Sequence, residues 1–134
     1  MEAATTTTRQ VPKEHTLVHF EIPAGEPTKV ARFYEQLFNW KFNKWEGGNT
    51  DYWLIVPQGN NPDDTIGGLY KRNNPQEGFL NYFLVKSIDS SLQKATQLGA
   101  KIVTQKQEIP NMGWFAVLTD PDGNTFAFYQ SKSM

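Results

Sequence analysis

The chain has 134 residues, and its 13 basic and 14 acidic side chains give a formal net charge of -1, so we expect neither nucleic acid nor a membrane as a partner. It contains no cysteine, which excludes disulfides, thiol nucleophiles and thiolate metal sites. Hydrophobic residues make up 38% of the chain, enough for one core, and the absence of a signal-peptide core or of an apolar run of about 18 residues predicts a cytoplasmic α+β domain.

The chain begins with a segment that resembles a tail. Residues 1–14 include four consecutive threonines and few apolar side chains, a composition typical of disorder. We therefore place a single domain at 15–134. Its first strand covers 17–22, a short run of β-prone residues that Pro23 is expected to end.

A helix is predicted to follow, with Pro27 in its first turn. Its apolar residues recur at the spacing of one helix face: Val30, Phe33, Tyr34, Leu37 and Phe38. Three strand-like runs come next, separated by segments rich in glycine, asparagine and proline: 40–45, 51–56 and 65–71.

The second half repeats the same order of elements. A strand is predicted at 79–86, and Ser90 with Gln93 forms a capping box that starts a short helix ended by Gly99. The buried stripe of this helix comprises Leu92, Ala95 and Leu98. Three strands close the chain: 101–108, 114–119 and 124–130. Residues 120–123, Asp-Pro-Asp-Gly, form a tight turn between the last two.

The pattern is therefore β-α-β-β-β twice, in modules of about 15–73 and 78–131. A four-stranded sheet with a helix on one face leaves its other face uncovered. Two such modules that curl around a shared cleft would cover that face, so we predict a curved mixed sheet built from a duplicated unit.

Several motifs are similar to those of the vicinal-oxygen-chelate superfamily, which includes glyoxalases, bleomycin-resistance proteins and extradiol dioxygenases. The resemblance covers about 15–130 and rests on segments in the family's order: His19–Pro23, Phe33–Trp40, Leu98–Ala100 and Asp120–Asn124. It implies two tandem βαβββ modules that form a glyoxalase-like cleft.

The resemblance also implies where a metal would bind. Metal-using members place one ligand, usually His, Gln or Glu, on each of four strands. The matching positions here are His19, the Gly67/Gly68 pair, Leu80 (or Asn81 if the register shifts by one) and Ala127. Only His19 could ligate, so we predict that the metal site is lost and that no cofactor is bound. We expect the two glycines to permit a close backbone approach or a bulge.

His19 and Glu21 alternate on the first strand, so both side chains are expected to face the cleft. One interpretation is catalytic, with the two side chains acting as acid and base or orienting a ligand. The alternative is a buried polar pair that satisfies itself or lies in a subunit interface.

Aromatic residues supply the remaining site candidates. Tyr82 and Tyr129 have the cleft-facing parity of their strands, and Trp53 and Trp114 lie early in theirs, where the mouth of a cleft would be. These four side chains could bind a planar or apolar ligand. Core or dimer packing explains the same residues without a ligand.

Three functions follow from these observations. The first is a homodimeric protein whose metal-free cleft binds a small organic molecule, as in bleomycin-resistance-like proteins. The second is a lyase, isomerase or dioxygenase of the same superfamily that uses His19 and Glu21, with an unusual metal arrangement or none. The third is a structural or partner-binding domain.

Overall fold

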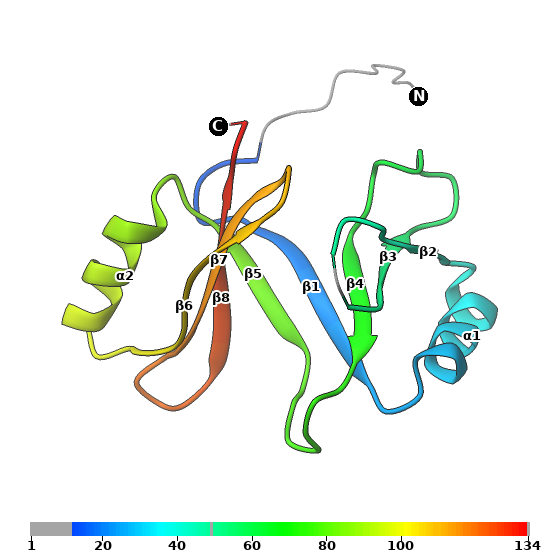
Figure 1. The fold of residues 1–134 in the computed structure, drawn as a ribbon, viewed down its shortest axis with the longest axis horizontal. Coiled ribbons are helices and arrows are strands. Elements are labelled where there is room, and N and C mark those ends of the chain that lie inside the picture. The colour runs from blue at the N-terminus through cyan, green and yellow to red at the C-terminus, as the bar shows by residue number, and fades with distance from the viewer. Residues whose placement is uncertain (1–11, 49, 134) are drawn as a thin grey trace, which may run out of the picture.

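The computed structural model describes residues 12–48 and 50–133. In this part of the chain, eight strands and two helices follow one another as β1 (Leu17–Ala24), α1 (Pro27–Phe38), β2 (Lys41–Lys44), β3 (Tyr52–Val56), β4 (Gly67–Lys71), β5 (Leu80–Leu84), α2 (Ile88–Gln97), β6 (Lys101–Ile109), β7 (Gly113–Thr119) and β8 (Thr125–Ser131) (Figure 1). The predicted α+β class and the repeated βαβββ order are confirmed. Neither helix has the length and apolar character needed to cross a membrane.

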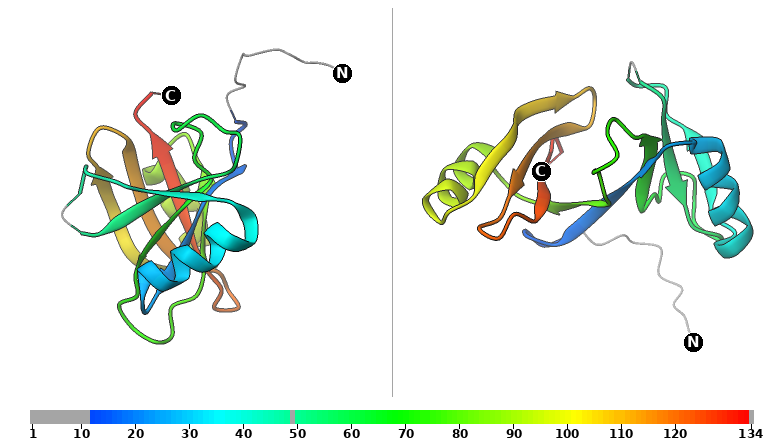
Figure 2. Two further views of the ribbon diagram at one scale, coloured as in Figure 1. Left: turned by 90° about the vertical axis from the view of Figure 1, so that its right-hand side faces the viewer. Right: turned by 90° about the horizontal axis from the view of Figure 1, so that it is seen from below.

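The strands form one mixed sheet in the order β2-β3-β4-β1-β5-β8-β7-β6. Within each module the first strand runs parallel to the last, β1 with β4 and β5 with β8. The modules join where β1 pairs antiparallel with β5, so they pair within one chain. The sheet curves between the two helices, which lie outside it at opposite ends (Figure 2). We call the helix-bearing side the outer face and the opposite side the inner face.

Helix α1 covers the outer face of the first module. Its partly buried residues pack on four buried side chains of β1, β3 and β4: Ile22, Ala24, Ile55 and Leu69. The helix ends at Asn39, which adopts a left-handed conformation and donates its N–H to the carbonyl of Glu35. Three members of the predicted apolar stripe remain about half exposed: Phe33, Leu37 and Phe38. The stripe is therefore wider than the sheet beneath it can cover.

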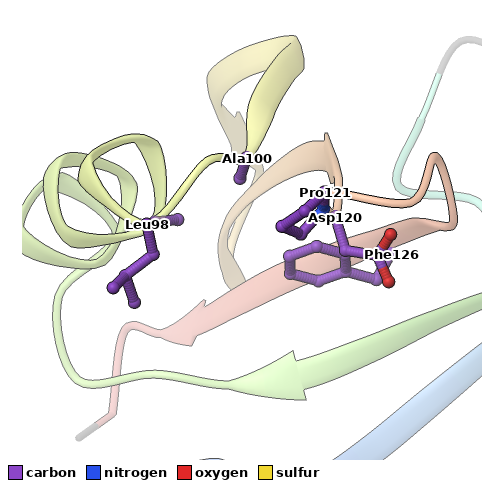
Figure 3. Close-up of a pocket in the computed structure, with 6 residues that line it drawn as sticks. Leu98, Ala100, Asp120, Pro121 and Phe126 are labelled. Atoms are coloured by element: carbon purple, nitrogen blue, oxygen red, sulfur yellow. The ribbon is translucent and has the colours of Figure 1, made fainter.

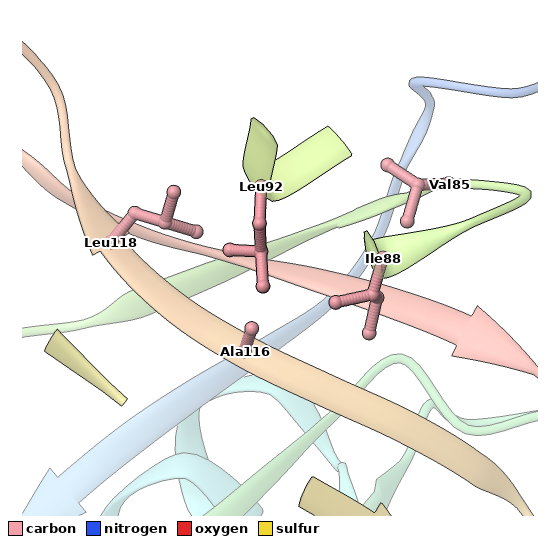
Figure 4. Packing of buried hydrophobic residues seen from close by; sticks show 5 residues of the cluster. All are labelled: Val85, Ile88, Leu92, Ala116 and Leu118. Carbon is pink, nitrogen blue, oxygen red and sulfur yellow. The ribbon is translucent and has the colours of Figure 1, made fainter. Parts of the chain in front are cut away.

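Helix α2 begins three residues earlier than predicted. Ser87 is its N-cap and accepts the N–H of Ser90, so the expected capping box at Ser90 is wrong. The earlier start buries Ile88 completely in a cluster with Val85, Leu92, Ala116 and Leu118 (Figure 4). The burial of Ile88 explains why the helix begins here, and the pattern of capping residues in the sequence does not reveal it.

Strand β1 does not end at Pro23 as predicted, but continues to Ala24. Proline lacks an N–H donor, yet its carbonyl still accepts a hydrogen bond from the Arg72 side chain. The pairing with β4 also persists beyond it, because Arg72 donates its N–H to the carbonyl of Ala24. The loss of one donor is therefore insufficient to end the strand.

The predicted turn between β7 and β8 is confirmed. One carboxylate oxygen of Asp120 accepts the backbone N–H groups of Asp122 and Asn124, and the other accepts the Asn124 side-chain amide. The bonds from Asn124 lower the pKa of Asp120. Gly123 has a φ of 87°, a conformation that favours glycine. These contacts fix the turn.

Most of the predicted tail, 1–11, lies outside the described residues. At its end, Glu14 accepts the N–H of Lys86 and His15 donates its N–H to the carbonyl of Leu84. These bonds attach the chain to the end of β5 just before β1 begins.

Candidate functional site

The inner face brings together polar side chains from three strands, β1, β3 and β5. Strand β1 lies at the centre, where Glu21 pairs with Gly68 of β4 on one side and with Leu80 of β5 on the other. His19, two residues earlier, pairs with Tyr82. Because alternate residues of a strand share a face, His19 and Glu21 point the same way, as the sequence predicts.

A hydrogen-bonded network connects these side chains. His19 Nε2 lies 2.7 Å from the hydroxyl of Tyr52, which donates to Glu21 Oε2 at 2.8 Å. Tyr82 donates its hydroxyl to Glu21 Oε1 at 2.7 Å. We call these four residues, His19, Glu21, Tyr52 and Tyr82, the inner-face network. His19 and Glu21 are thus connected through the hydroxyl of Tyr52.

The number of hydrogens defines the protonation of the network. A tyrosine hydroxyl has one hydrogen, and that of Tyr52 is directed at Glu21. His19 must then donate from Nε2, which leaves its Nδ1 as an unprotonated acceptor. When Glu21 is ionised, it accepts a hydrogen from each phenol and retains further acceptor capacity.

Burial shifts the pKa values of all four groups. It lowers the pKa of His19 from 6.5 to about 4, because the charged imidazolium loses its hydration. Burial also raises the pKa of Glu21, against the opposing hydrogen bonds of Tyr82 and Tyr52. Burial and the nearby Glu21 carboxylate raise the pKa of both tyrosines. At neutral pH, histidine and both phenols are therefore neutral.

We expect the His19 ring to stay neutral until the pH falls to about 4. The histidine of the unfolded chain takes up a proton near pH 6.5, whereas the buried ring of the folded protein does so only near pH 4. The free energy of unfolding is therefore not reduced by His19 above pH 6.5, and it decreases as the pH falls from 6.5 towards 4. Glu21 has the opposite effect: because its pKa is raised in the folded protein, its contribution to the free energy of unfolding decreases as the pH rises. NMR titration of the His19 ring separates the two effects, and a midpoint near 6.5 would contradict the burial argument.

The two glycines of β4 make room for this arrangement. A Cβ atom at Gly67 would lie 2.5 Å from the Phe20 carbonyl oxygen, so the predicted close backbone approach is confirmed. A Cβ atom at Gly68 would lie 1.9 Å from the hydroxyl oxygen of Tyr52. The phenol of Tyr52 from β3 therefore occupies the space that a side chain at Gly68 would fill.

A row of rings extends from the network along the inner face. The Trp45 ring contacts Tyr52 edge to face at 5.9 Å between centroids. Tyr52 stacks with His19 at 6.5 Å, and His19 meets Tyr82 edge to face at 5.4 Å. Tyr82 in turn contacts Phe115 at 6.5 Å. The row thus reaches from the end of β2 to β7.

The four aromatic ligand candidates divide between the two faces. Tyr82 belongs to the inner-face network, and Tyr129 packs in the same cluster while donating its hydroxyl to the Met112 carbonyl. Trp53 packs instead with the core beneath α1, and Trp114 with the core beneath α2. Their expected position at the mouth of a cleft is wrong, because their strand parity directs both rings to the outer face.

The family's metal positions do not form a donor set in this chain. His19 contributes an imidazole, but Gly68, Leu80 and Ala127 offer no ligating atom. Glu21 is close by, although both of its oxygens already accept phenol hydrogens. In the described parts of the chain, no three His, Cys, Asp or Glu side chains are grouped so that they could hold a metal. The residues present therefore do not fit the four-ligand site.

An apolar hollow of about 170 Å³ lies on the outer face near the end of α2 (Figure 3). Its lining residues come from α2, the turn after it, the β7–β8 turn and β8: Ala95, Leu98, Ala100, Asp120, Pro121 and Phe126. Asp120 is the only ionisable group in this lining, and its carboxylate is used by the turn. The hollow thus offers no free polar anchor for a ligand.

Tyr52 is not among the residues selected from the sequence, although it lies in a predicted strand beside Trp53. Alternation could have identified it, since Tyr52 and Trp53 must face opposite sides of the sheet. Gly68 provides a second signal, because it lies diagonally opposite Tyr52 in the pairing of β3 with β4 and leaves space for a large side chain. Neither signal reveals that the hydroxyl bridges His19 and Glu21.

Comparisons with known proteins identify the family. Residues 16–128 match the family model described as the Glyoxalase/Bleomycin resistance protein/Dioxygenase superfamily. "Putative glyoxylase CFP32" of Mycobacterium tuberculosis is 28% identical over 116 residues, and the same identity holds for its counterpart in Mycobacterium bovis. The match covers 84% of this chain but only 42% of those proteins, so the chain spans less than half of their length.

Solved structures with the same fold are more distant in sequence. Hypothetical protein BH1468 from Bacillus halodurans has a TM-score of 0.65 at 16% identity, with 91% of this chain and 98% of that chain covered. Methylmalonyl-CoA epimerase from Streptomyces coelicolor, in complex with 2-nitronate-propionyl-CoA, has a TM-score of 0.64 at 11% identity, with 90% and 99% covered. At these identities the likeness establishes the fold alone.

Proposed function

Because the chain belongs to the Glyoxalase/Bleomycin resistance protein/Dioxygenase superfamily, we propose that its inner face binds a small organic ligand without a metal. Glu21 and Tyr82 form the polar centre of the site, and His19 and Tyr52 complete it. Tyr129 and the neighbouring rings supply apolar contact area. The cytoplasmic location inferred from the sequence stays a prediction.

The inner-face network is the observation that carries this proposal. A polar group with a purely structural role is expected to have its hydrogen-bonding capacity filled by the protein. Here Glu21 retains acceptor capacity, and His19 Nδ1 has no hydrogen-bond partner among the described residues. Both acceptors lie on the inner face beside a row of rings, which is the mixture of polar and apolar groups typical of ligand sites.

Replacing His19 by alanine tests the proposal. If the network serves a ligand, the melting temperature should change little, while the thermal stabilisation by binding compounds from a panel of small organic molecules should be lost. If the network is structural, the change leaves the partly buried hydroxyl oxygen of Tyr52 without its His19 donor and should cost about 1–3 kcal/mol of unfolding free energy. That loss, with ligand-induced shifts unchanged, would refute the binding function.

A second candidate is acid–base catalysis of the lyase or isomerase type, which the bridging position of Tyr52 favours. Glu21 could remove a proton from a substrate and, once protonated, return it, while His19 and Tyr52 hold the carboxylate in place through their hydrogen bonds. Hydrogen exchange of small carbonyl compounds in D2O tests this chemistry. Tyr52→Phe should slow the exchange about 10²-fold or more, whereas no exchange by the wild-type protein would exclude proton transfer from those compounds.

Metal content separates the metal-free site from a metal-dependent one. Elemental analysis of protein purified without chelators is expected to find no stoichiometric transition metal, because the four-ligand set is incomplete. A stoichiometric metal that is lost in His19→Ala would overturn the metal-free proposal and favour an enzyme with an unusual ligand set.

We also propose that the protein is a homodimer. Among the residues that the structure describes, nothing pairs with the outer edges of β2 and β6. Several large apolar side chains also remain exposed: Phe33, Leu37, Phe38, Phe79 and Leu98. Association would cover such surfaces. Sedimentation at micromolar concentration should give the mass of a dimer, and a monomer under those conditions would count against it.

A further inference from the structure

The carboxylate at the centre of the inner-face network has no cation beside it. Its two oxygens accept phenol hydrogens, and the ion pairs among the described residues involve other acids. The charged group that acts on Glu21 is a second carboxylate, Glu77, in the loop between β4 and β5. The inner-face network therefore contains a carboxylate that is not paired with any basic side chain of the described residues.

Two phenols contact the same carboxylate, and further rings contact those phenols. Tyr52 and Tyr82 direct their hydroxyls towards Glu21, and Trp45 and Phe115 extend the row of rings on either side. Ring faces carry negative electrostatic potential and attract cations. A phenol that donates its hydrogen to a carboxylate gains electron density, which strengthens that attraction.

The Trp45 ring is held in place by the backbone that follows it. Cβ atoms at Gly47 and Gly48 would lie 2.6 Å and 2.8 Å from ring atoms of Trp45, so the glycine pair lets the main chain lie directly against the indole. The N–H of Trp45 also donates to the carbonyl of Tyr52. These contacts position Trp45, which lies at one end of the row of rings, in the absence of a ligand.

Building on the proposed binding function, we infer that the inner face selects an organic cation, an ammonium or guanidinium group on a small organic body, over neutral or anionic molecules of the same shape. Glu21 supplies the counter-charge and the rings of Tyr52, Tyr82 and Trp45 contact the charged group. An anionic ligand would be repelled by Glu21 and Glu77, since no basic side chain of the described chain pairs with Glu21.

Three probes of similar shape test the inference: choline, its uncharged isostere in which carbon replaces nitrogen, and pivalate as the anion. Each is titrated at constant ionic strength while NMR follows the ring resonances of Tyr82 and His19. Choline should bind about tenfold more tightly than the isostere, and pivalate should not bind measurably. Glu21→Gln should abolish the preference, whereas Glu35→Gln, on the exposed side of α1, should leave it unchanged.

Each other result has a defined meaning. Equal or tighter binding of the isostere or of pivalate would overturn cation selectivity while leaving the proposed binding function intact. Preference for choline that persists in Glu21→Gln would overturn the role of this carboxylate. If none of the probes shifts the Tyr82 resonance, cation binding is refuted, and the compound panel with His19→Ala decides the proposed function independently. The wild-type comparison remains decisive even if Glu21→Gln fails to fold.

Discussion

Replacing Gly68 by alanine is expected to lower the free energy of unfolding by about 2–5 kcal/mol. The new methyl group would lie 1.9 Å from the hydroxyl oxygen of Tyr52 and 2.1 Å from Cζ, so the phenol must move. Its displacement breaks the hydrogen bonds to His19 and Glu21 and leaves a carboxylate partly buried with one donor fewer. Chemical denaturation of wild type and variant measures the loss.

Two further variants test whether the loss of stability comes from the displacement of Tyr52 or from any replacement of glycine by alanine. Gly78→Ala is the matched control, because a Cβ atom there meets nothing within 4 Å, and its stability should stay near that of the wild type. Tyr52→Ala combined with Gly68→Ala removes the clash, so the two losses should be far from additive. Equal melting of Gly68→Ala and Gly78→Ala would show that Tyr52 does not fill the space beside β4.

Replacing Ala127 by glutamate should have a comparable effect and should not create a metal site. Ala127 is completely buried and lies between Tyr82 of β5 and Val117 of β7. A carboxylate there would be buried near Glu21 without a cation, and we expect a loss of about 3–5 kcal/mol. Zinc should not restore stability, because Gly68 and Leu80 still provide no ligand.

Thr125→Glu is the control for Ala127→Glu. Thr125 lies two residues earlier on the same face of β8 but is exposed, so a glutamate there should change stability little. Melting curves of both variants with and without zinc complete the experiment. A large zinc-dependent rise in the melting temperature of Ala127→Glu would reveal a ligand geometry different from the one assigned here.

The architecture could be predicted from the amino-acid sequence, because periodicity and turn chemistry are local signals. The apolar spacing around Val30 predicts α1, and the turn at Asp120 predicts the β7–β8 connection; both are found. The order of elements then repeats, so the duplicated βαβββ unit follows without any knowledge of long-range contacts. Strand alternation likewise sufficed to place His19 and Glu21 on a common face.

The assembly of the site could not be predicted in this way, because it depends on contacts between distant segments. Tyr52 lies 33 positions from His19 and 31 from Glu21, and no local pattern specifies that its hydroxyl connects them. The face on which Trp53 and Trp114 lie depends on the register of their strands, and one step along a strand reverses the direction of a side chain. A hydrogen-bonded site depends on which strands become neighbours, and burial against the whole sheet selects that arrangement.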